Sequence, residues 1–259
     1  MGKVITIASG KGGTGKTTLT ANLGICLARQ GKKVLLVDAD IAMANLSLLL
    51  GMQTSPITLH DVLLGETSIQ DALYEGPNGI EILPSGLSLE SYRKIDSERL
   101  RSVISTIKEN YDFILIDAAA GIERAVLSAL TSSDAVLLIT EATPASLADG
   151  LKTKIITEKL GGHAIGVIIN MLRNEKGELE KEEIMQTLEL PCYGVIPYDQ
   201  EVRRSFYDKK GVPVVIRCPN CPASKAIETI AIKLLGGEVS VETHKESFIK
   251  RILRVIFRK

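Results

Sequence analysis

Gly10-Lys11-Gly12-Gly13-Thr14-Gly15-Lys16-Thr17-Thr18 is the stretch of this sequence that decides its fold, because it follows an apolar run and opens a segment with helical spacing. Its glycines let successive backbone N–H groups turn toward one point without a Cβ in the way, and the helix N-terminus adds partial positive charge. Such a loop favours a triphosphate: Lys16 reaches the β- and γ-phosphates, the Thr17 hydroxyl ligates Mg²⁺, and Thr18 bonds the α-phosphate. The stretch therefore predicts a nucleotide-binding loop. A fortuitous glycine-rich turn is the alternative, and the agreement of the motif with its flanks disfavours it.

Short apolar runs and helical segments alternate along the rest of the chain. The runs are rich in β-branched residues and nearly continuous, as strands covered on both faces are. They occupy residues 4–8, 33–37, 80–83, 113–116, 135–139, 164–169 and 193–196, and helical spacing occupies residues 17–30, 97–110, 145–160 and 223–235. The alternation predicts an α/β fold with a doubly wound, mostly parallel sheet and helices on both faces.

Length and composition favour one domain and exclude several classes of protein. The 259 residues, 45% hydrophobic, suffice for one α/β domain, which we expect over residues 1–236. The formal net charge is zero, so the chain as a whole offers no electrostatic case for nucleic-acid binding. Four cysteines do not suggest the framework of a small secreted protein, and a reducing cytoplasm fits better. No apolar stretch approaches the roughly 18 to 20 residues needed to span a bilayer, so any membrane contact is expected to be peripheral.

Acidic residues follow two of the predicted strands. Asp38 and Asp40 stand where the run 33–37 ends, and Asp117 follows the run 113–116. Open α/β sheets bind their ligands at the carboxyl ends of the strands, so these side chains are candidates for the same site. Asp117 has the form of a Walker B carboxylate, which would hold Mg²⁺ through water. For Asp38 and Asp40, a purely structural cap or turn is the alternative.

Lys11 indicates which kind of nucleotide-binding protein this is. As a second lysine just before Gly12-Gly13, it resembles the signature lysine of the MinD/ParA family of deviant Walker A ATPases. The resemblance covers essentially the whole chain. The run 38–46 is similar to the family's switch I, and the run 118–123 is similar to its switch II. Within switch II one position departs from the family, because Ala119 stands where a proline is common; residues 140–142 also differ from the family's usual sequence.

The resemblance implies a homodimer that sandwiches ATP and Mg²⁺ between its two subunits. In that arrangement Lys11 crosses to the partner's phosphates and stabilises charge in the transition state, as an arginine finger does. Asp38 is implied to lie near Mg²⁺, and Asp40 is implied to orient the attacking water. Lys11, Lys16 and Asp40 are thus the expected catalytic residues, although Lys11 could also be a solvated surface lysine.

Further site residues are implied by the same resemblance at the ends of later strands. Asn170, Pro197 and Asp199 are implied to contact adenine, with helix or turn capping as the alternative. Asp149 is implied to face the signature lysine.

The last fifteen residues, 245–259, differ in character from the rest of the chain. When these residues are placed on a helix at about 100° per residue, their apolar side chains gather on one face and their basic side chains on the other. A basic, amphipathic, terminal helix suits an anionic bilayer surface, and two copies on one dimer bind far more tightly than one. The alternative is a helix packed on the protein's own core or on a partner. The expected membrane-contacting residues, after a tether at 237–244, are Phe248, Ile249, Lys250, Arg251, Ile252, Leu253, Arg254, Ile256 and Phe257.

Three functions are compatible with these motifs. The first is a MinD-like ATPase on the inner face of the cell membrane that helps to position the division site or another structure, and whose turnover a protein partner stimulates. The second is a ParA-like partition ATPase that binds DNA, which the neutral composition disfavours. The third is an iron–sulfur cluster carrier using Cys218 and Cys221. Those carriers have their cysteine pair earlier in the chain, so incidental cysteines are the preferred interpretation.

Overall fold

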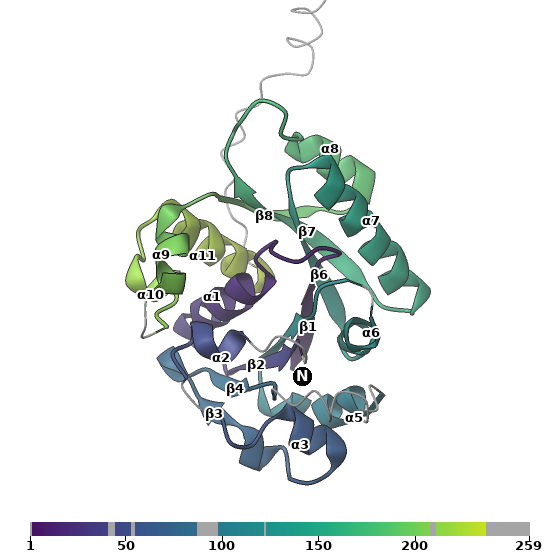
Figure 1. Ribbon diagram of the computed structural model, residues 1–259, viewed down its shortest axis with the longest axis vertical. Helices are drawn as coiled ribbons and strands as arrows, with labels where there is room; N and C mark the ends of the chain where they lie inside the picture. The colour runs from purple at the N-terminus through teal and green to yellow at the C-terminus, as the bar shows by residue number, and fades with distance from the viewer. Residues whose placement is uncertain are drawn as a thin grey trace, which may run out of the picture.

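The computed structural model describes residues 2–40, 45–52, 55–86, 98–121, 123–207 and 211–236 (Figure 1). Within these ranges one eight-stranded sheet runs in the order β3-β4-β2-β5-β1-β6-β7-β8. The strands are β1 (Lys3–Ala8), β2 (Val34–Ala39), β3 (Tyr74–Glu75), β4 (Glu81–Leu83), β5 (Phe113–Ala118), β6 (Ala135–Glu141), β7 (Ala164–Leu172) and β8 (Cys192–Pro197). All neighbouring strands are parallel except β3 and β4, which pair antiparallel. The predicted fold class is confirmed.

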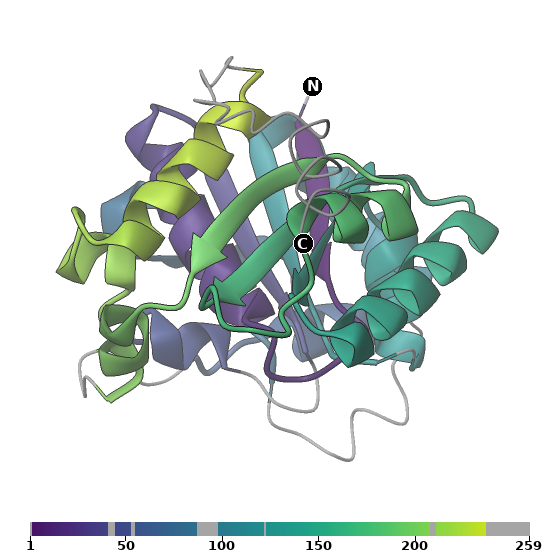
Figure 2. The ribbon, with the colours of Figure 1, turned by 90° about the horizontal axis from the view of Figure 1, so that it is seen from above.

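Helices cover both faces of the sheet, and Figure 2 shows α1 and α11 on one face and α6, α7 and α8 on the other. Two hydrophobic cores result, one beneath each helical layer. The helices are α1 (Lys16–Arg29), α2 (Leu46–Leu49), α3 (Leu59–Leu64), α5 (Glu98–Ile107), α6 (Arg124–Thr131), α7 (Pro144–Lys159), α8 (Lys181–Leu188), α9 (Gln200–Tyr207), α10 (Val214–Arg217) and α11 (Pro222–Leu234), with 3₁₀ turns η1 (Gln70–Ala72), η2 (Pro77–Gly79) and η3 (Lys108–Asn110).

The continuous apolar runs of the central strands follow from this burial on both faces. In β5, Ile114 and Ile116 pack in the core beneath α5 and α6, whereas Leu115 packs in the opposite core against α1. All three side chains are fully buried. Each such side chain stabilises the fold by about 1.5–3 kcal/mol, so a polar residue on either face of this strand would weaken a core.

The sequence located the main elements but missed the short ones. All seven predicted strands are present with ends shifted by a few residues. The predicted helix over 97–110 is α5 followed by the 3₁₀ turn η3, so it is shorter than expected. The antiparallel edge strand β3 and the helix α2 were not predicted; with two and four residues, they are too short for their periodicity to be recognised.

Parallel pairing brings the carboxyl ends of β1, β2, β5, β6, β7 and β8 to one edge of the sheet, and the predicted site residues lie at this edge. The predicted tether and terminal helix, residues 237–259, lie outside the described residues, as do residues 41–44 of switch I and Ile122 of switch II. None of the helices in the described ranges is both long and apolar enough to cross a membrane.

Candidate nucleotide-binding site

The loop between β1 and α1 has the backbone shape that its glycines were expected to allow. Gly13 and Gly15 have φ angles of 81° and 95°, a region that side-chain-bearing residues rarely adopt. Gly10 has a different constraint: a Cβ there would lie 2.4 Å from the backbone oxygen of Asp149. The loop is therefore held against α7 by close backbone contact, and the backbone of Asp149 lies beside the loop.

Ser9, the residue before the loop, makes several hydrogen bonds to loop residues, and the sequence did not predict this role. Its Oγ is buried, donates to the carbonyl of Lys11 at 2.7 Å, and accepts hydrogen bonds from Thr14 Oγ1 at 2.9 Å and from Lys16 Nζ at 3.0 Å. A serine after a strand carries no distinguishing sequence signal, so only the structure could find it. The network fixes the loop backbone and places the Lys16 ammonium inside it.

Lys16 is 7% exposed, which is rare for a lysine and indicates that the surrounding structure holds its ammonium in place. Burial lowers the pKa of Lys16, while the carboxylates of Asp117 and Asp40 raise it back toward its ordinary value. A desolvated ammonium beside open space is well suited to bind an anion, because its field is weakly screened. Lys11, five residues earlier in the same loop, is instead exposed.

Asn170, at the carboxyl end of β7, braces the loop from the other side. Its Nδ2 donates to the carbonyl of Thr14 at 2.7 Å, across 156 residues of sequence. The side chain is buried and lines the same cavity as the loop. Bracing the loop is thus its observed role, and the adenine contact stays a prediction.

Replacing Gly15 with alanine is expected to strain this brace. The new Cβ would lie 2.4 Å from Asn170 Nδ2 at a φ of +95°, so both the backbone and the packing oppose it. We expect a loss of about 2–4 kcal/mol in the free energy of unfolding, measured by chemical denaturation without nucleotide.

Gly31→Ala is the matched control for that measurement. Gly31 also has a positive φ, of +76°, but a Cβ there meets no described atom within 4 Å. The Gly31→Ala variant should therefore lose only the part of the free energy of unfolding that comes from backbone strain, about 1 kcal/mol. Equal losses in the two variants would show that Asn170 does not brace the loop.

Two carboxylates, Asp38 and Asp117, lie side by side at the ends of β2 and β5, where they are direct register partners. Asp38 is fully buried; its Oδ1 accepts from the Asp40 amide at 3.1 Å, and its Oδ2 accepts from the Leu46 amide at 3.2 Å. Asp38 therefore ties together the residues on either side of positions 41–44. Burial and the neighbouring Asp117 raise the pKa of Asp38 well above its ordinary value.

Asp117 is also buried, and its Oδ1 has no hydrogen-bond partner within the described structure. Burial raises the pKa of Asp117 to about 7, although hydrogen bonds from Thr17 and Thr20 and the charge of Lys16 oppose the rise. Asp117 has an unpaired carboxylate oxygen and lies beside a second buried acid, and the single charge of Lys16 does not balance both carboxylates. These residues therefore fit a cation.

The donor set suits Mg²⁺ in particular. Oxygen donors are supplied by Thr17, Asp38 and Asp117, all at the base of the loop. Among the described residues, no three His, Cys, Asp or Glu side chains gather closely enough to hold a metal by themselves. Mg²⁺ is usually bound by one or two carboxylates with waters and substrate phosphates, so a partial protein site of this kind is expected.

A cavity of about 700 Å³ extends from the loop toward α9 and α11. Its size is within the range of cofactor and ligand sites, and its polar groups gather at the loop end while its far end is apolar. The described lining comprises Gly12, Gly13, Gly15, Lys16, Thr17, Thr18, Leu19, Asp40, Asn45, Leu48, Leu49, Ala120, Asn170, Met171, Ile196, Val202, Ser205, Phe206, Gly211 and Ile227.

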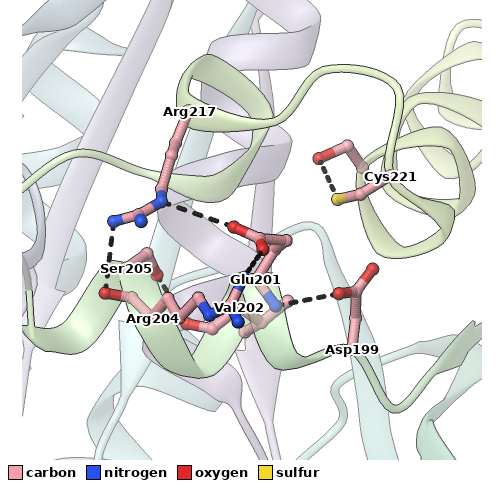
Figure 3. Close-up of polar contacts among 8 residues, drawn as sticks. Asp199, Glu201, Val202, Arg204, Ser205, Arg217 and Cys221 are labelled. Atoms are coloured by element: carbon pink, nitrogen blue, oxygen red, sulfur yellow. Dashed lines mark hydrogen bonds and ion pairs between the residues drawn. The ribbon is translucent and has the colours of Figure 1, made fainter.

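Some of the residues predicted at this site are not part of the described cavity lining. Pro197 and Asp199 are outside its described lining. The Asp199 carboxylate accepts from the amide of Glu201 at 2.9 Å, which caps the start of α9 (Figure 3). It also accepts from the amide of Ala223 at 3.2 Å, so it caps the start of α11 as well. For Asp199, the structure therefore shows the capping role that the sequence left open as an alternative. The Asp149 carboxylate pairs with Lys152 at 3.3 Å.

Known proteins resemble this chain over nearly its full length. A protein-family profile described as an AAA domain matches residues 2–159. An uncharacterized ATP-binding protein of Methanocaldococcus jannaschii is 44% identical over 259 residues, covering 99% of this chain and 97% of that protein. The septum site-determining protein MinD of a Synechocystis species is 35% identical, covering 92% and 91%. The solved structure of the MinD protein of Pyrococcus horikoshii with Mg-ADP superposes with a TM-score of 0.86 at 38% identity, covering 92% and 98%.

Proposed function

Because this chain belongs to the MinD/ParA family of P-loop ATPases, we propose that it is a nucleotide-dependent membrane switch. In this proposal the chain hydrolyses ATP, pairs with a second copy when ATP is bound, and docks reversibly on the inner face of the cell membrane. Its cofactors are ATP and Mg²⁺. The proposed task is to help position the division site or another cellular structure, under the control of a protein partner that stimulates turnover.

The described residues divide the chemistry among themselves. The ammonium of Lys16 neutralises charge on the β- and γ-phosphates at the base of the cavity. Thr17, Asp38 and Asp117 would hold Mg²⁺, which when bound neutralises the phosphate oxygens as charge shifts to them. Asp40 lines the same cavity at the end of β2, where its carboxylate can accept a proton from water and orient it toward the γ-phosphate.

The observation that carries the proposal is the contrast between two lysines of one loop. Lys16 is buried at the phosphate site, whereas Lys11 is exposed although Ser9 holds its carbonyl in place. A fixed backbone with an outward side chain is how a loop presents a charge to another molecule. A second copy that faces this edge would receive Lys11 at its own phosphates, which makes pairing depend on ATP.

Pairing would also control membrane residence through residues 245–259. A single short amphipathic segment binds a bilayer weakly, and each Lys or Arg near an anionic surface adds about 1 kcal/mol. Two segments on one dimer act at high effective concentration, so the dimer binds far more tightly than the monomer. ATP hydrolysis would then release both subunits.

Co-sedimentation with vesicles that contain anionic lipid tests this function. We expect the wild type to sediment with ATP and not with ADP, and deletion of residues 248–259 to abolish sedimentation without changing turnover in solution. Ile252→Glu, which places a charge on the expected apolar face, should reduce the bound fraction more than about tenfold, because each copy loses a buried side chain worth about 1.5–3 kcal/mol.

Ser247→Glu is the matched control, since it adds the same charge on the expected polar face. It should bind nearly as the wild type does. Equal loss in both variants, or equal binding of the wild type with ATP and ADP, would count against the switch. A DNA fragment retained by the ATP-bound protein in the absence of vesicle binding would favour the partition function instead.

A further inference from the structure

Cys218 and Cys221 flank the turn that joins α10 to α11, and the proposed nucleotide chemistry uses neither of them. The Cys221 amide donates to the Cys218 carbonyl at 3.2 Å, and the Cys218 side chain is near enough to contribute to the raised pKa of Cys221. A turn closed between residues i and i+3 keeps its two end Cα atoms less than about 7 Å apart, and the Cα atoms of a disulfide are usually about 4.4–6.8 Å apart. The pair is therefore placed for a bond between its sulfurs.

The two thiols differ in access, and this sets the order of their reaction. Cys221 is buried at the start of α11, where burial raises its pKa and its Sγ lies 3.2 Å from Ser224 Oγ. Cys218 is half-exposed. An outside reagent reaches Cys218 first, and Cys221 is the neighbour that can resolve the product. The other cysteines, Cys26 and Cys192, are buried singly, and burial raises the pKa of both.

Hydrogen bonds and an ion pair connect this turn to the wall of the cavity (Figure 3). Asp199 caps both α9 and α11 through the amides of Glu201 and Ala223. Arg217, at the end of α10, lies 3.5 Å from the Glu201 carboxylate and donates to the backbone oxygen of Arg204 in α9 at 3.4 Å.

The same helices supply part of the cavity lining, with Val202 and Ser205 from α9 and Ile227 from α11. Ile227 lies one turn beyond Ala223 on the same helix. We therefore expect a change in the first turn of α11 to shift Ile227, the lining side chain that this helix supplies.

We propose that Cys218 and Cys221 form a reversible disulfide, with a low-molecular-weight disulfide such as glutathione disulfide as oxidant, and that this bond weakens nucleotide binding. The Cys218 thiolate attacks one sulfur of the oxidant, giving a mixed disulfide and one released thiol. The Cys221 sulfur then displaces the second thiol from Cys218. The protein loses two protons and two electrons, and one oxidant molecule gains them to become two thiols, so the exchange balances.

The effect on binding rests on the proposed function, while the disulfide itself does not. Bond formation draws the Cys221 sulfur toward Cys218 and away from Ser224, which pulls on the first turn of α11. We expect Mg-ADP affinity to fall about tenfold, within the range of couplings between neighbouring sites.

The test treats the full-length protein with glutathione disulfide, maps its thiols by mass spectrometry, and measures Mg-ADP affinity by calorimetry before and after, with dithiothreitol to reverse the change. The wild type should show a Cys218–Cys221 peptide link and the tenfold loss, both reversed by the reductant. Cys218→Ser should keep full affinity throughout. Cys192→Ala, which removes a buried thiol elsewhere, should respond as the wild type does.

Two results would overturn the proposal: a glutathione adduct that stays on Cys218 without an internal link, or a link that forms while affinity is unchanged. If the reduced wild type fails to bind Mg-ADP, the proposed function is wrong, and the peptide map still decides whether the disulfide forms.

Discussion

Lys16→Ala is expected to abolish detectable nucleotide binding. Lys16 is buried at the base of the cavity and is held there by Ser9, so its ammonium meets the phosphates in a weakly screened environment. Each hydrogen bond to a charged group contributes about 1.5–3 kcal/mol, and two lost contacts weaken binding at least about a hundredfold. Calorimetric titration with Mg-ADP measures the effect directly.

The signature lysine of the same loop provides the control. Lys11→Ala should bind Mg-ADP with nearly wild-type affinity, because Lys11 is exposed and its backbone carbonyl, rather than its side chain, is the part held by Ser9. It should instead lose turnover, since the proposed partner contact is missing. Thermal unfolding of both variants serves as the control that each is folded. Wild-type affinity in folded Lys16→Ala would show that the loop does not hold phosphate.

Asp40→Ala is expected to stop hydrolysis and to leave nucleotide binding intact. Asp40 lines the cavity, but its carboxylate is negative and is not expected to bind the phosphates. The loop and Lys16 supply that binding. Removal of a positioned general base lowers kcat by about 10²- to 10⁴-fold. Phosphate release measured beside Mg-ADP affinity separates the two effects.

Asp40→Asn sharpens the test, because it keeps the size of the side chain and removes only the charge. Both variants should lose turnover to a similar degree. Asp40 also contributes a favourable charge near Lys16, so a modest change in affinity is acceptable. Turnover unchanged in Asp40→Ala would show that a different group orients the water.

Patterns that act over a few residues were visible in the sequence. Alternating apolar runs and helical segments predicted the parallel sheet, because strands buried on both faces must be apolar throughout. The loop at 10–18 predicted a phosphate site for a similar reason: the glycines, the lysine and the following helix are neighbours in the chain. Short elements such as α2 and α10, with four residues each, carry too little periodicity to be predicted.

Roles that depend on distant contacts were not visible. Asp199 was expected at the adenine, with capping as the alternative, and the structure shows that its carboxylate caps two helices that begin at Gln200 and Pro222. Asn170 was expected there too, and the structure adds its bond to Thr14. The bond from Asn170 to Thr14 and the bond from the Ala223 amide to Asp199 join residues far apart in the sequence, so these partners meet only when the strands and helices are assembled.

The amino-acid sequence by itself determined that this chain binds a phosphate at the end of its first strand, because backbone shape and local charge are set within nine consecutive residues. Only the tertiary structure decided how that loop is held. Ser9 orders the loop from the residue before it, and Asn170 braces it from β7. Asp38 and Asp117 become neighbours because β2 pairs with β5. The physical reason is burial: the sheet removes these polar groups from water, and each then needs a partner that the fold brings from elsewhere in the chain.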